Sequence, residues 1–449
     1  MSWDHRAGLV VVGAGMAGLT AAAAAARSGV EVVVVEKAEA IGGSAALSGG
    51  FFWTMRDLTL MRELIPDGDP ELQRAVIDDY PKATAWLESM GAMLGPQLTP
   101  SNVPAGVGHL FDNHGYLHAC CRAVEAAGGV VLVAARVTDL VTTGDRVVGV
   151  VIEDRDGTSR IGSDWILLAT GGFQADPILR ADYLGAQARD VLLRSNPCST
   201  GDGLLLGRSV GATTTASMTG FYGHPIATPR NRPFIPGDFA RLSQSSYAPF
   251  AVLLDRTGRR FVDESRGHPT QVQAMIDRPA QRAVLVADER LRRMYATRAQ
   301  APGVEVIDRP AEAAASGARV ARADTLAGLA HRIAAWGYPE SVVVASVEQF
   351  NRGVTTAAPM APGRRTHRAP LDEAPYFAVE VEPSITFTHG GLRIDAQARV
   401  LRENGAPVPG LLAAGVDGAG VHCVGYAGGL ATGAVFGLRA AALVASTRA

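Results

Sequence analysis

The chain has 449 residues and a formal net charge of −2, and 47% of its residues are hydrophobic. A length prior of roughly 150 residues per domain predicts two or three globular domains. The near-neutral charge argues against the basic surface of a nucleic-acid-binding protein, so we expect no nucleic-acid partner.

The spacing of the cysteines and the length of the apolar runs indicate the cellular compartment in which we expect the protein. Cys120 and Cys121 are adjacent, whereas Cys198 and Cys423 stand alone. This pattern is neither a disulfide framework nor a metal-ligand set, and it is typical of a reducing compartment. No apolar run reaches the ~18–20 residues that span a bilayer. We therefore expect a cytoplasmic protein without a membrane span.

The first elements in chain order form a β-α-β unit. Residues 8–12 are apolar and predict a short buried strand. Residues 16–28 are rich in alanine, which predicts a helix. Residues 31–35 carry four valines after Glu31, as expected for a parallel strand that is buried on both faces.

The turn inside this unit has the pattern of a dinucleotide site. Gly13 makes the tight turn, Gly15 lets the backbone approach a pyrophosphate, and Gly18 lets the helix pack on the strand. The helix N-terminus then faces the phosphates. Glu36 ends the second strand, where a carboxylate accepts hydrogen bonds from a ribose diol and repels the 2′-phosphate of NADP.

Later patterns predict two helices, at 58–90 and 117–127. They also predict three strands, at 130–138, 146–153 and 164–169. The glycine turn at 143–145, just before the strand at 146–153, predicts a hairpin through these residues. From about residue 220 proline becomes dense and the pattern loosens, and from about 380 strand-and-glycine patterning returns. The chain is expected to end in a helix after Gly433.

Two glycine-lined strand ends distinguish FAD from NAD. One strand runs into the turn at 170–172, and another ends at Gly415 before the glycine-rich segment 428–433. A dinucleotide longer than NAD needs such approaches along its ribityl chain and ring. A second helix N-terminus near the ring can stabilise negative charge on a reduced flavin. The sequence therefore predicts FAD.

The predicted fold class is α/β: a Rossmann-type FAD-binding domain with an inserted α+β capping domain that lines the substrate site. The predicted boundaries are 1–220 for the first part of the FAD-binding domain, 221–350 for the cap and 351–449 for the second part.

Several motifs occur in the order that is characteristic of one superfamily. They are IGGSAALSGG at 41–50, TGG at 170–172, TGDG at 200–203, GRRFVDE at 258–264, THGGL at 388–392, AAG at 413–415 and GG at 428–429. On these motifs the chain resembles the fumarate reductase/succinate dehydrogenase flavoprotein superfamily, to which the 3-ketosteroid dehydrogenases belong. The resemblance covers nearly the whole chain.

The resemblance, together with the glycine motif, implies a set of cofactor contacts. They are Gly13, Gly15, Met16, Ala17, Gly18, Glu36, Lys37, Gly43, Ser44, Ser48, Gly49, Gly50, Val137, Thr170, Gly172, Asp202, Gly415, Gly429, Leu430 and Ala431. Members that attach FAD covalently use a histidine where this chain has Gly43, so non-covalent FAD is implied. Val416 and Asp417 follow the AAG turn where many members have Glu, which leaves the ribityl contacts there open.

The resemblance also implies hydride transfer between flavin N5 and a carbon beside an electron-withdrawing group. Fumarate-type members bind carboxylates with an arginine two residues before the C-terminal Gly-Gly, and Tyr426 stands there in this chain. A phenol donates one hydrogen bond without a charge, which suits a ketone oxygen. The alternative for Tyr426 is packing near the flavin. His224 resembles a family histidine in a His-Pro step, with a structural role as its alternative. A second family histidine is replaced by Phe387, and His389 directly precedes the glycines.

Two residues after the 258–264 motif could move a proton. His268 titrates near neutrality when unperturbed, at roughly 6.5. Arg266, with a pKa above about 12, needs an electropositive setting to act as a base, and its alternative is a surface salt bridge. Glu264 is expected to be structural. His109, His114 and His118 surround Tyr116, but no cysteine or carboxylate set completes a metal site there, so we expect no metal. We expect Tyr116 in the core.

We therefore expect an FAD-dependent dehydrogenase acting on CH–CH groups, which introduces a C=C bond α,β to a carbonyl of a small-molecule substrate. Tyr426 would hold the oxygen, and His268 or Arg266 would take the proton. One alternative is reduction of an activated C=C bond, with Arg266 as proton donor. Another is a non-catalytic FAD-carrying electron-transfer subunit. The sequence does not identify the electron acceptor.

Overall fold

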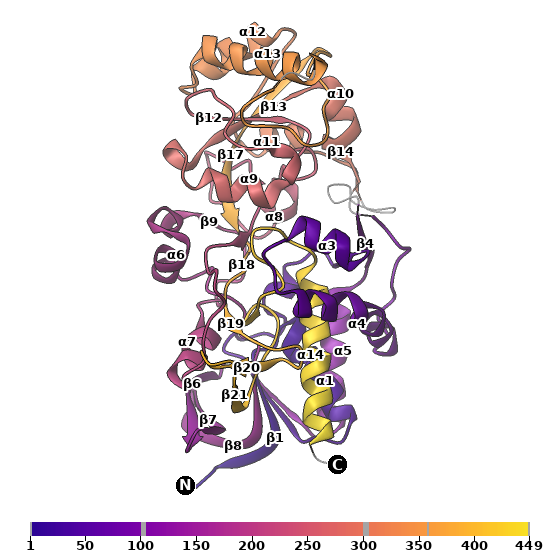
Figure 1. Ribbon diagram of the computed structural model, residues 1–449, viewed down its shortest axis with the longest axis vertical. Coiled ribbons are helices and arrows are strands. Elements are labelled where there is room, and N and C mark those ends of the chain that lie inside the picture. The colour runs from indigo at the N-terminus through magenta and orange to yellow at the C-terminus, as the bar shows by residue number, and fades with distance from the viewer. Residues whose placement is uncertain (1, 100–104, 300–304, 357–358, 448–449) are drawn as a thin grey trace.

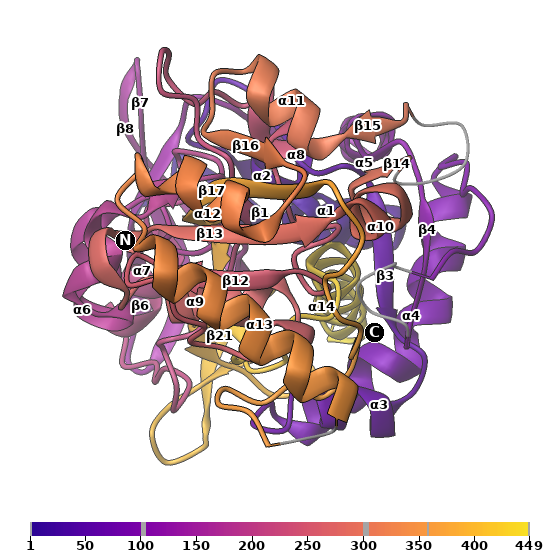
Figure 2. The same cartoon turned by 90° about the horizontal axis from the view of Figure 1, so that it is seen from above.

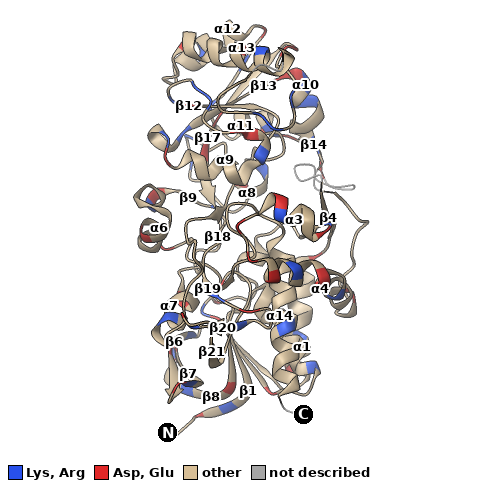
Figure 3. Ribbon diagram, in the orientation of Figure 1, with Lys and Arg blue, Asp and Glu red and all other residues tan. Residues whose placement is uncertain are grey.

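The computed structural model describes residues 2–99, 105–299, 305–356 and 359–447. Figure 1 shows an elongated molecule with two bodies stacked along its long axis. The lower body holds both termini, and the upper body is formed by the middle of the chain. Figure 3 shows acidic and basic residues interspersed over both bodies rather than gathered in one block.

The lower body is built on an 8-stranded sheet with the strand order β20-β21-β8-β1-β2-β5, to which β6 and β7 add through β8. Its strands are β1 His5–Val12, β2 Val32–Val35, β5 Val130–Leu132, β6 Arg136–Thr143, β7 Arg146–Asp154, β8 Gly157–Leu168, β20 Arg399–Leu401 and β21 Pro407–Ala413. β1, β2, β5, β8 and β21 run parallel. Because helices cover this sheet, its central strands are buried on both faces, as the valine-rich sequences predict.

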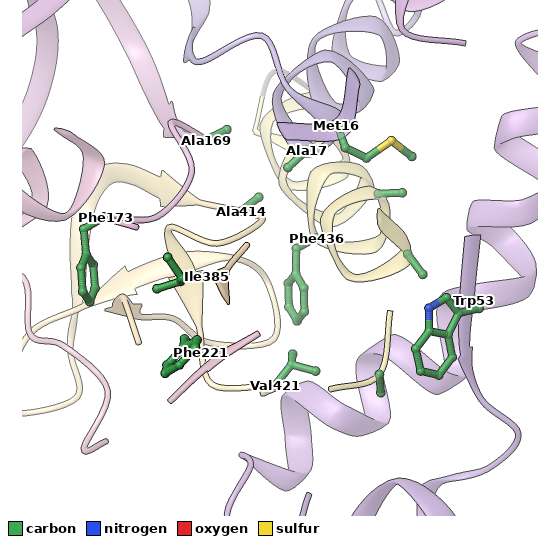
Figure 4. Packing of buried hydrophobic residues seen from close by; sticks show 14 of the residues in the cluster. Met16, Ala17, Trp53, Ala169, Phe173, Phe221, Ile385, Ala414, Val421 and Phe436 are labelled. Atoms are coloured by element: carbon green, nitrogen blue, oxygen red, sulfur yellow. The ribbon is translucent and has the colours of Figure 1, made fainter. Parts of the chain in front are cut away.

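Three helices pack together beside this sheet: α1 Met16–Arg27, α5 Asn113–Ala126 and α14 Gly429–Ser446. Figure 4 shows Met16 and Ala17 of α1 beside Phe436 of α14. A Cβ on Gly437 would lie 2.6 Å from the carbonyl oxygen of Ala17, so the two helix backbones approach each other closely. This contact brings the N-terminal ends of α1 and α14, from opposite ends of the chain, to one place.

Among the described residues, α14 alone is long and apolar enough to cross a membrane by length and composition. The sequence reasoning did not identify it as such a run. In the structure 56% of its apolar window is buried, because α14 packs against α1 and α4 (Pro70–Ser89). Burial of this kind is also a property of a core helix in a globular domain.

The upper body contains a second, mainly antiparallel sheet with the order β11-β17-β13-β12, to which β16 and β9 also pair. Its strands are β9 Leu192–Leu193, β11 Pro225–Ile226, β12 Val252–Asp255, β13 Ala283–Asp288, β16 Val320–Ala323 and β17 Tyr376–Ile385. Figure 2 shows α12 (Leu326–Ala334) and α13 (Glu340–Thr356) crossing over this sheet. In Figure 1, α9 (His268–Met275) lies between the sheet and the lower body.

The two bodies are joined where two short strands pair. β10 (Phe221–Tyr222) pairs with β18 (Phe387–Thr388), so the chain leaves and re-enters the lower body side by side. The boundary at 221 stays a prediction, because β9 already pairs with β17 of the upper sheet at residues 192–193. The return differs from the predicted 351, because β17 pairs with β13 and therefore belongs to the upper sheet as far as Ile385. The α/β class with an inserted α+β cap is confirmed.

Local predictions differ from the structure at three places. The segment 58–90 forms two helices, α3 (Leu58–Leu64) and α4, rather than one. The segment 130–138 is divided between β5 and β6, with Ala134 at φ 53° between them. The final helix begins at Gly429, before the expected Gly433. The hairpin through 143–145 is confirmed as β6 and β7.

The remaining helices and strands are short or connect the two bodies. They are α2 Gly43–Ala46, β3 Phe51–Met55, β4 Gly106–Leu110, α6 Pro177–Leu184, α7 Asp202–Ser209, α8 Asp238–Arg241, α10 Glu289–Leu291, β14 Thr297–Arg298, β15 Ile307–Asp308, α11 Arg309–Ala315, β19 Leu392–Arg393 and β22 Gly418–Ala419. Short 3-10 segments occur at Ala186–Asp190, Glu264–Arg266 and Pro279–Gln281, and a π turn at Arg292–Ala296.

Candidate active site

One large cavity, of about 1270 Å³, lies between the two bodies and extends to the carboxyl ends of the parallel strands. Ligands of open α/β sheets bind at these strand ends. Pockets for a single small ligand commonly measure about 300–1,000 Å³. The larger volume here, and its lining by both bodies, indicate a site for an extended cofactor together with a second molecule.

The glycine turn at the start of α1 has two structural glycines and one that leaves open space. A Cβ on Gly13 would lie 2.4 Å from the carbonyl oxygen of Ala169, and one on Gly18 would lie 2.0 Å from that of Gly13. A Cβ on Gly15 would meet no atom of the chain nearer than 3.9 Å, although Gly15 lines the cavity. The space at Gly15 is therefore available to a ligand, as a pyrophosphate requires.

Glu36 lies beyond this turn with its carboxylate held in place by the backbone. Its two oxygens accept hydrogen bonds from the amides of Ala14 and Ala38, each at 2.8 Å. A carboxylate has about four acceptor sites, so two remain for the hydroxyls of a ribose. Lys37 turns away from Glu36 and pairs with Asp202 at 2.8 Å.

Most of the predicted cofactor residues line the cavity. They are Gly13, Gly15, Met16, Ala17, Glu36, Lys37, Gly43, Ser44, Ser48, Gly49, Val137, Thr170, Asp202, Gly415, Gly429 and Leu430. Gly18, Gly50, Gly172 and Ala431 do not line it, and their contact with FAD stays a prediction. Gly50 and Gly172 instead allow close packing, since a Cβ there would lie 2.3 Å from the carbonyl oxygen of Phe111 and 2.2 Å from Oγ1 of Thr388.

A polar row lines the middle of the cavity, and only Ser44 among its members was identified from the sequence. Nε2 of Gln174 donates to Oγ of Ser195 at 3.1 Å, and the Ser195 and Ser44 hydroxyls lie 3.1 Å apart. Oε1 of Gln174 is buried and accepts no hydrogen bond from the described residues. Such an orphaned acceptor is costly unless a ligand supplies a donor. The imide N–H of a flavin is a donor of that kind, so these residues fit FAD.

Asp417 supports the flavin side of the cavity from behind. It is buried, and its carboxylate accepts hydrogen bonds from the backbone N–H of Thr170 at 2.5 Å and from the Thr170 hydroxyl at 2.9 Å. Burial raises the pKa of Asp417 to about 7. Val416 lines the cavity and Asp417 does not. Asp417 therefore holds the Thr170 turn, and no described contact places it on a ribityl chain.

Aromatic and histidine rings gather where the cap meets the lower body. The rings of Tyr426 and Tyr222 are stacked with centroids 3.9 Å apart. Tyr426 Oη accepts a hydrogen bond from the backbone N–H of Gly429, the first residue of α14, at 2.9 Å. Tyr222 Oη lies 3.4 Å from Nε2 of His268, and the His268 and His224 rings are 4.7 Å apart. The structure thus brings three of the four predicted catalytic residues together.

The fourth, Arg266, lies on the cavity wall with an exposed side chain, in the turn before α9. It forms no ion pair with a described residue, so the salt bridge considered for it is absent from the part of the chain that is described. Its neighbour Glu264 is fully buried and pairs with Arg260 and Arg364 at 2.6 and 2.9 Å. The expectation of a structural role for Glu264 agrees with this geometry.

Burial keeps the ring cluster uncharged at neutral pH. Burial, with a smaller contribution from the Arg194 charge, lowers the pKa of His268 to about 3. The same causes, together with His268 and Arg309, lower the pKa of His224 well below its ordinary value. Burial raises the pKa of Tyr222 and that of Tyr426. The imidazoles are therefore neutral but weak bases in this buried setting, and the phenols are hydrogen-bond donors.

The absence of a metal at the histidines at 109, 114 and 118 stays a prediction. No group of three or more potential metal ligands occurs among the described residues. Tyr116 is buried and hydrogen-bonded to the hydroxyl of Thr20 at 2.8 Å and to Nε1 of Trp86 at 3.1 Å, and it does not line the cavity. Core packing is thus where the structure places it.

The site also contains residues that the sequence reasoning did not single out: Tyr222, Arg194 and Arg309. Tyr222 stands two residues before the His224-Pro225 step, and its position there was the one available signal. Arg194 and Arg309 belong to no motif, and only the folding of the cap over the strand ends brings them to the cavity.

Comparison with known proteins agrees with this geometry. Residues 8–431 match the family model described as "FAD binding domain". A Shewanella frigidimarina protein named "Probable fumarate reductase Ifc3" is 27% identical over 96% of this chain and 73% of its own length. The 4-oxocyclohexanecarboxylate 2-dehydrogenase of Sinomonas cyclohexanicum is 27% identical over 94% of this chain and 90% of its own. Two longer relatives are covered for less than half of their length.

A solved structure shows the same fold. The 3-ketosteroid delta1-dehydrogenase of Sterolibacterium denitrificans, in complex with 1,4-androstadiene-3,17-dione, superimposes with a TM-score of 0.77 at 20% sequence identity. The superposition covers 99% of this chain and all of the other. The chain therefore belongs to the FAD-binding family that includes fumarate reductases and ketosteroid dehydrogenases, and it is an FAD-dependent oxidoreductase acting on CH–CH groups.

Proposed function

We propose that the enzyme desaturates a ketone, introducing a C=C bond α,β to the carbonyl. The observation that carries this proposal is the hydrogen bond from the Gly429 N–H to Tyr426 Oη at 2.9 Å. Because that oxygen already accepts a hydrogen bond at a helix N-terminus, its own O–H is polarised and available to donate. A polarised phenol is a suitable partner for a ketone oxygen that gains negative charge.

The proton from the α carbon goes to His268. Its imidazole is neutral at working pH, it is buried beside Tyr222, and it lines the cavity on the same side as Tyr426. Tyr222 orients the imidazole through its hydroxyl and fixes Tyr426 through ring stacking. Arg266 is the weaker candidate base, because an exposed guanidinium stays protonated.

FAD, when bound, supplies the acceptor for the hydride that leaves the β carbon, and the expected electron partner beyond it stays unidentified. We propose that FAD is held without a covalent bond at three residues. The open space at Gly15 takes the pyrophosphate, and the side-chain oxygens of Glu36 and Gln174 accept hydrogen bonds from the ribose and the flavin. Gly43 takes the place of an attaching histidine. The names of two relatives, a 4-oxocyclohexanecarboxylate dehydrogenase and a 3-oxosteroid 1-dehydrogenase, support oxidation beside a ketone. A cytoplasmic location stays a prediction.

A second candidate is reduction of an activated C=C bond. The observation that favours it is Arg266, which lines the cavity without an ion pair among the described residues and could deliver a proton. The name of the Shewanella frigidimarina relative supports this direction. A third, a non-catalytic FAD-carrying subunit, is disfavoured because the cap closes a built cavity with an ordered ring cluster.

Anaerobic mixing separates these candidates. The FAD-loaded enzyme is mixed with cyclic ketones, and loss of the visible flavin absorption is followed. Bleaching by ketones supports the desaturase. Reoxidation of the chemically reduced enzyme by enoates, without any bleaching by ketones, would overturn the proposal in favour of the reductase. Reaction with neither class would favour the electron-carrying subunit.

A further inference from the structure

Two arginines, the buried Arg309 and the half-buried Arg194, line the cap side of the cavity, apart from the glycine turns that face the cofactor. Arg194 follows β9, at the junction of the two bodies, and Arg309 is the first residue of α11. Arg309 is only 3% exposed. Around them the wall is formed by Phe239, His224 and two adjacent serines at 245 and 246.

Neither arginine has a carboxylate partner among the described residues. Nε of Arg194 donates to the carbonyl of Phe239 at 3.0 Å, and Nη1 donates to the hydroxyl of Thr386 at 3.2 Å. Nη1 of Arg309 donates to the carbonyls of Ala240 and Arg241. A guanidinium has five N–H donors in a planar fork. Each arginine therefore keeps N–H groups that no described acceptor takes.

Elsewhere, buried arginines are satisfied in two ways: some share a buried carboxylate, whereas Arg180 on α6 donates only to backbone carbonyls. Arg260 and Arg364 both pair with Glu264, inside the cap. Arg241, which borders Arg309, takes the nearby Glu312 in a two-fold hydrogen bond at 2.7 and 3.0 Å. Desolvating a guanidinium is costly unless an anion compensates it. Unlike Arg180, Arg194 and Arg309 line the cavity, so a bound ligand can supply their anion.

The surroundings of the pair are electropositive. Burial lowers the pKa of Arg194 to about 10 and also lowers the pKa of Arg309. The wall around them carries three further arginines, at 266, 298 and 365, and none of these forms an ion pair with a described residue. Two carboxylates oppose this positive charge: Glu63, which is exposed on α3, and Glu312, which pairs with Arg241 and whose charge also acts on Arg309. The Ser246 hydroxyl is buried in the same wall and has no described partner.

Arg194 is also close to the reacting end of the cavity. Its charge interacts with both Tyr222 and Tyr426. Its hydrogen-bond partner Thr386 precedes Phe387, whose ring is 5.3 Å from that of Tyr222. A ligand whose carbonyl meets Tyr426 would therefore place a group at Arg194 only a short way along its skeleton.

We propose that the substrate is a compact keto acid, whose carboxylate is bound by Arg194 and Arg309 while its ketone is held at Tyr426. Guanidinium groups match a carboxylate through paired N–H donors. The inference rests on the proposed desaturation of a ketone and specifies the substrate class. It distinguishes this site from one built for a large neutral ketone, which would leave both guanidinium groups unpaired in the complex.

The test measures binding rather than turnover. The FAD-loaded enzyme is titrated calorimetrically with two matched pairs of ligands, cyclohexanecarboxylate with cyclohexanecarboxamide and benzoate with benzamide. We expect each carboxylate to bind at least about tenfold more tightly than its amide. Arg309→Gln and Arg194→Gln should each raise the Kd of the carboxylates about 10- to 100-fold, the range for hydrogen bonds to a charged group. The ratio of carboxylate to amide Kd should rise accordingly.

Arg332→Gln is the matched control, because Arg332 is exposed on α12 and its loss changes the net charge equally. It should leave the ratio unchanged. The inference is overturned if amides bind as tightly as carboxylates, or if Arg332→Gln has the same effect as Arg309→Gln. Should a Gln variant fail to retain FAD, the inference is still tested by the ratio of carboxylate to amide Kd in the unaltered enzyme and in Arg309→Lys. Lysine keeps the positive charge but loses the planar fork of N–H donors.

These ligands carry no ketone, so the inference and the proposed function can fail separately. Carboxylate binding without bleaching by any ketone would refute only the desaturase. Bleaching by neutral cyclic ketones, with no preference for carboxylates, would refute only the keto acid.

Discussion

Replacing Tyr426 with phenylalanine removes one hydroxyl and keeps the ring. The ring stacking on Tyr222 at 3.9 Å and the edge packing on Trp53 at 5.4 Å are kept, so the fold and the cavity should persist. The hydrogen bonds that the hydroxyl oxygen accepts from the Gly429 N–H and from Trp53 are lost, which should lower the stability of the variant. The variant loses the donor to the developing negative charge on the carbonyl oxygen. Removal of one donor of this kind costs about 10²–10³ in turnover, or about 2.7–4 kcal/mol.

The assay is anaerobic flavin reduction in a stopped-flow instrument under single-turnover conditions, because this isolates the chemical step from reoxidation. Tyr80→Phe is the matched control. Its hydroxyl also bonds to the backbone, at the carbonyl of Phe52 at 3.0 Å, but Tyr80 is buried on α4 and does not line the cavity. That control should lower stability and leave the flavin reduction rate unaltered. An unchanged rate in Tyr426→Phe would refute the assigned role of the phenol.

Three further predictions concern the cofactor turn, the cap and a buried carboxyl group. Gly15→Ala should fold, since the new methyl group meets no atom of the chain nearer than 3.9 Å, but it should bind FAD much more weakly, because the methyl group fills the space for the pyrophosphate. Gly18→Ala should fail to fold, because its Cβ would lie 2.0 Å from a carbonyl oxygen. Thermal unfolding and FAD titration check both variants, and normal FAD affinity in Gly15→Ala would contradict the pyrophosphate assignment. Glu264→Gln should lower the free energy of unfolding by about 3–5 kcal/mol, because it leaves two buried guanidinium groups without their carboxylate. Chemical denaturation measures this free energy. A loss below about 1 kcal/mol would be inconsistent with a structural role for Glu264. The pKa of Asp417 is raised to about 7 from an ordinary value near 3.8, so its contribution to stability is present below about pH 4 and is lost as the pH rises through 7. The stability of Asp417→Asn minus that of the unaltered protein should therefore be larger at pH 8 than at pH 5. Equal differences at the two pH values would count against the raised pKa.

The lower body could be predicted from the sequence because its signals are local. The strand at 8–12, the alanine-rich helix and the valine run lie within 35 residues and form the pairs β1–β2 that their patterns predict. The glycine turn depends partly on a contact between near neighbours, Gly18 with Gly13, although Gly13 also packs against the distant Ala169. Elements whose reason is short-range sterics and burial were therefore accessible without the structure.

Three boundaries that differ from the prediction have different physical causes. The break between α3 and α4 had signals in the sequence, since Asp69 caps α4 and Pro70 is its first residue. The break between β5 and β6 depends on Ala134 in a left-handed conformation, for which alanine gives no warning. The return of the chain from the cap to the lower body, which comes later than predicted, also had no local signal in the sequence. Only the pairing of β17 with β13 shows that this strand belongs to the cap.

The candidate site was predictable at its cofactor end and much less so at its substrate end. Tyr426, His224 and His268 were reached through motifs, and the structure places them in one cluster. Arg194 and Arg309 are separated by more than a hundred residues and meet the cavity through cap packing alone. Long-range packing of this kind leaves no periodic or local trace in a single sequence.

The most direct test is the visible spectrum of the purified protein, recorded before and after denaturation and with FAD added to any cofactor-free material. The geometry at Gly15, Glu36 and Gln174 predicts a yellow protein with one FAD per chain, which is released into solution when the chain unfolds. A colourless protein that takes up no FAD would contradict the whole account, and flavin that stays attached to the unfolded chain would contradict its non-covalent binding.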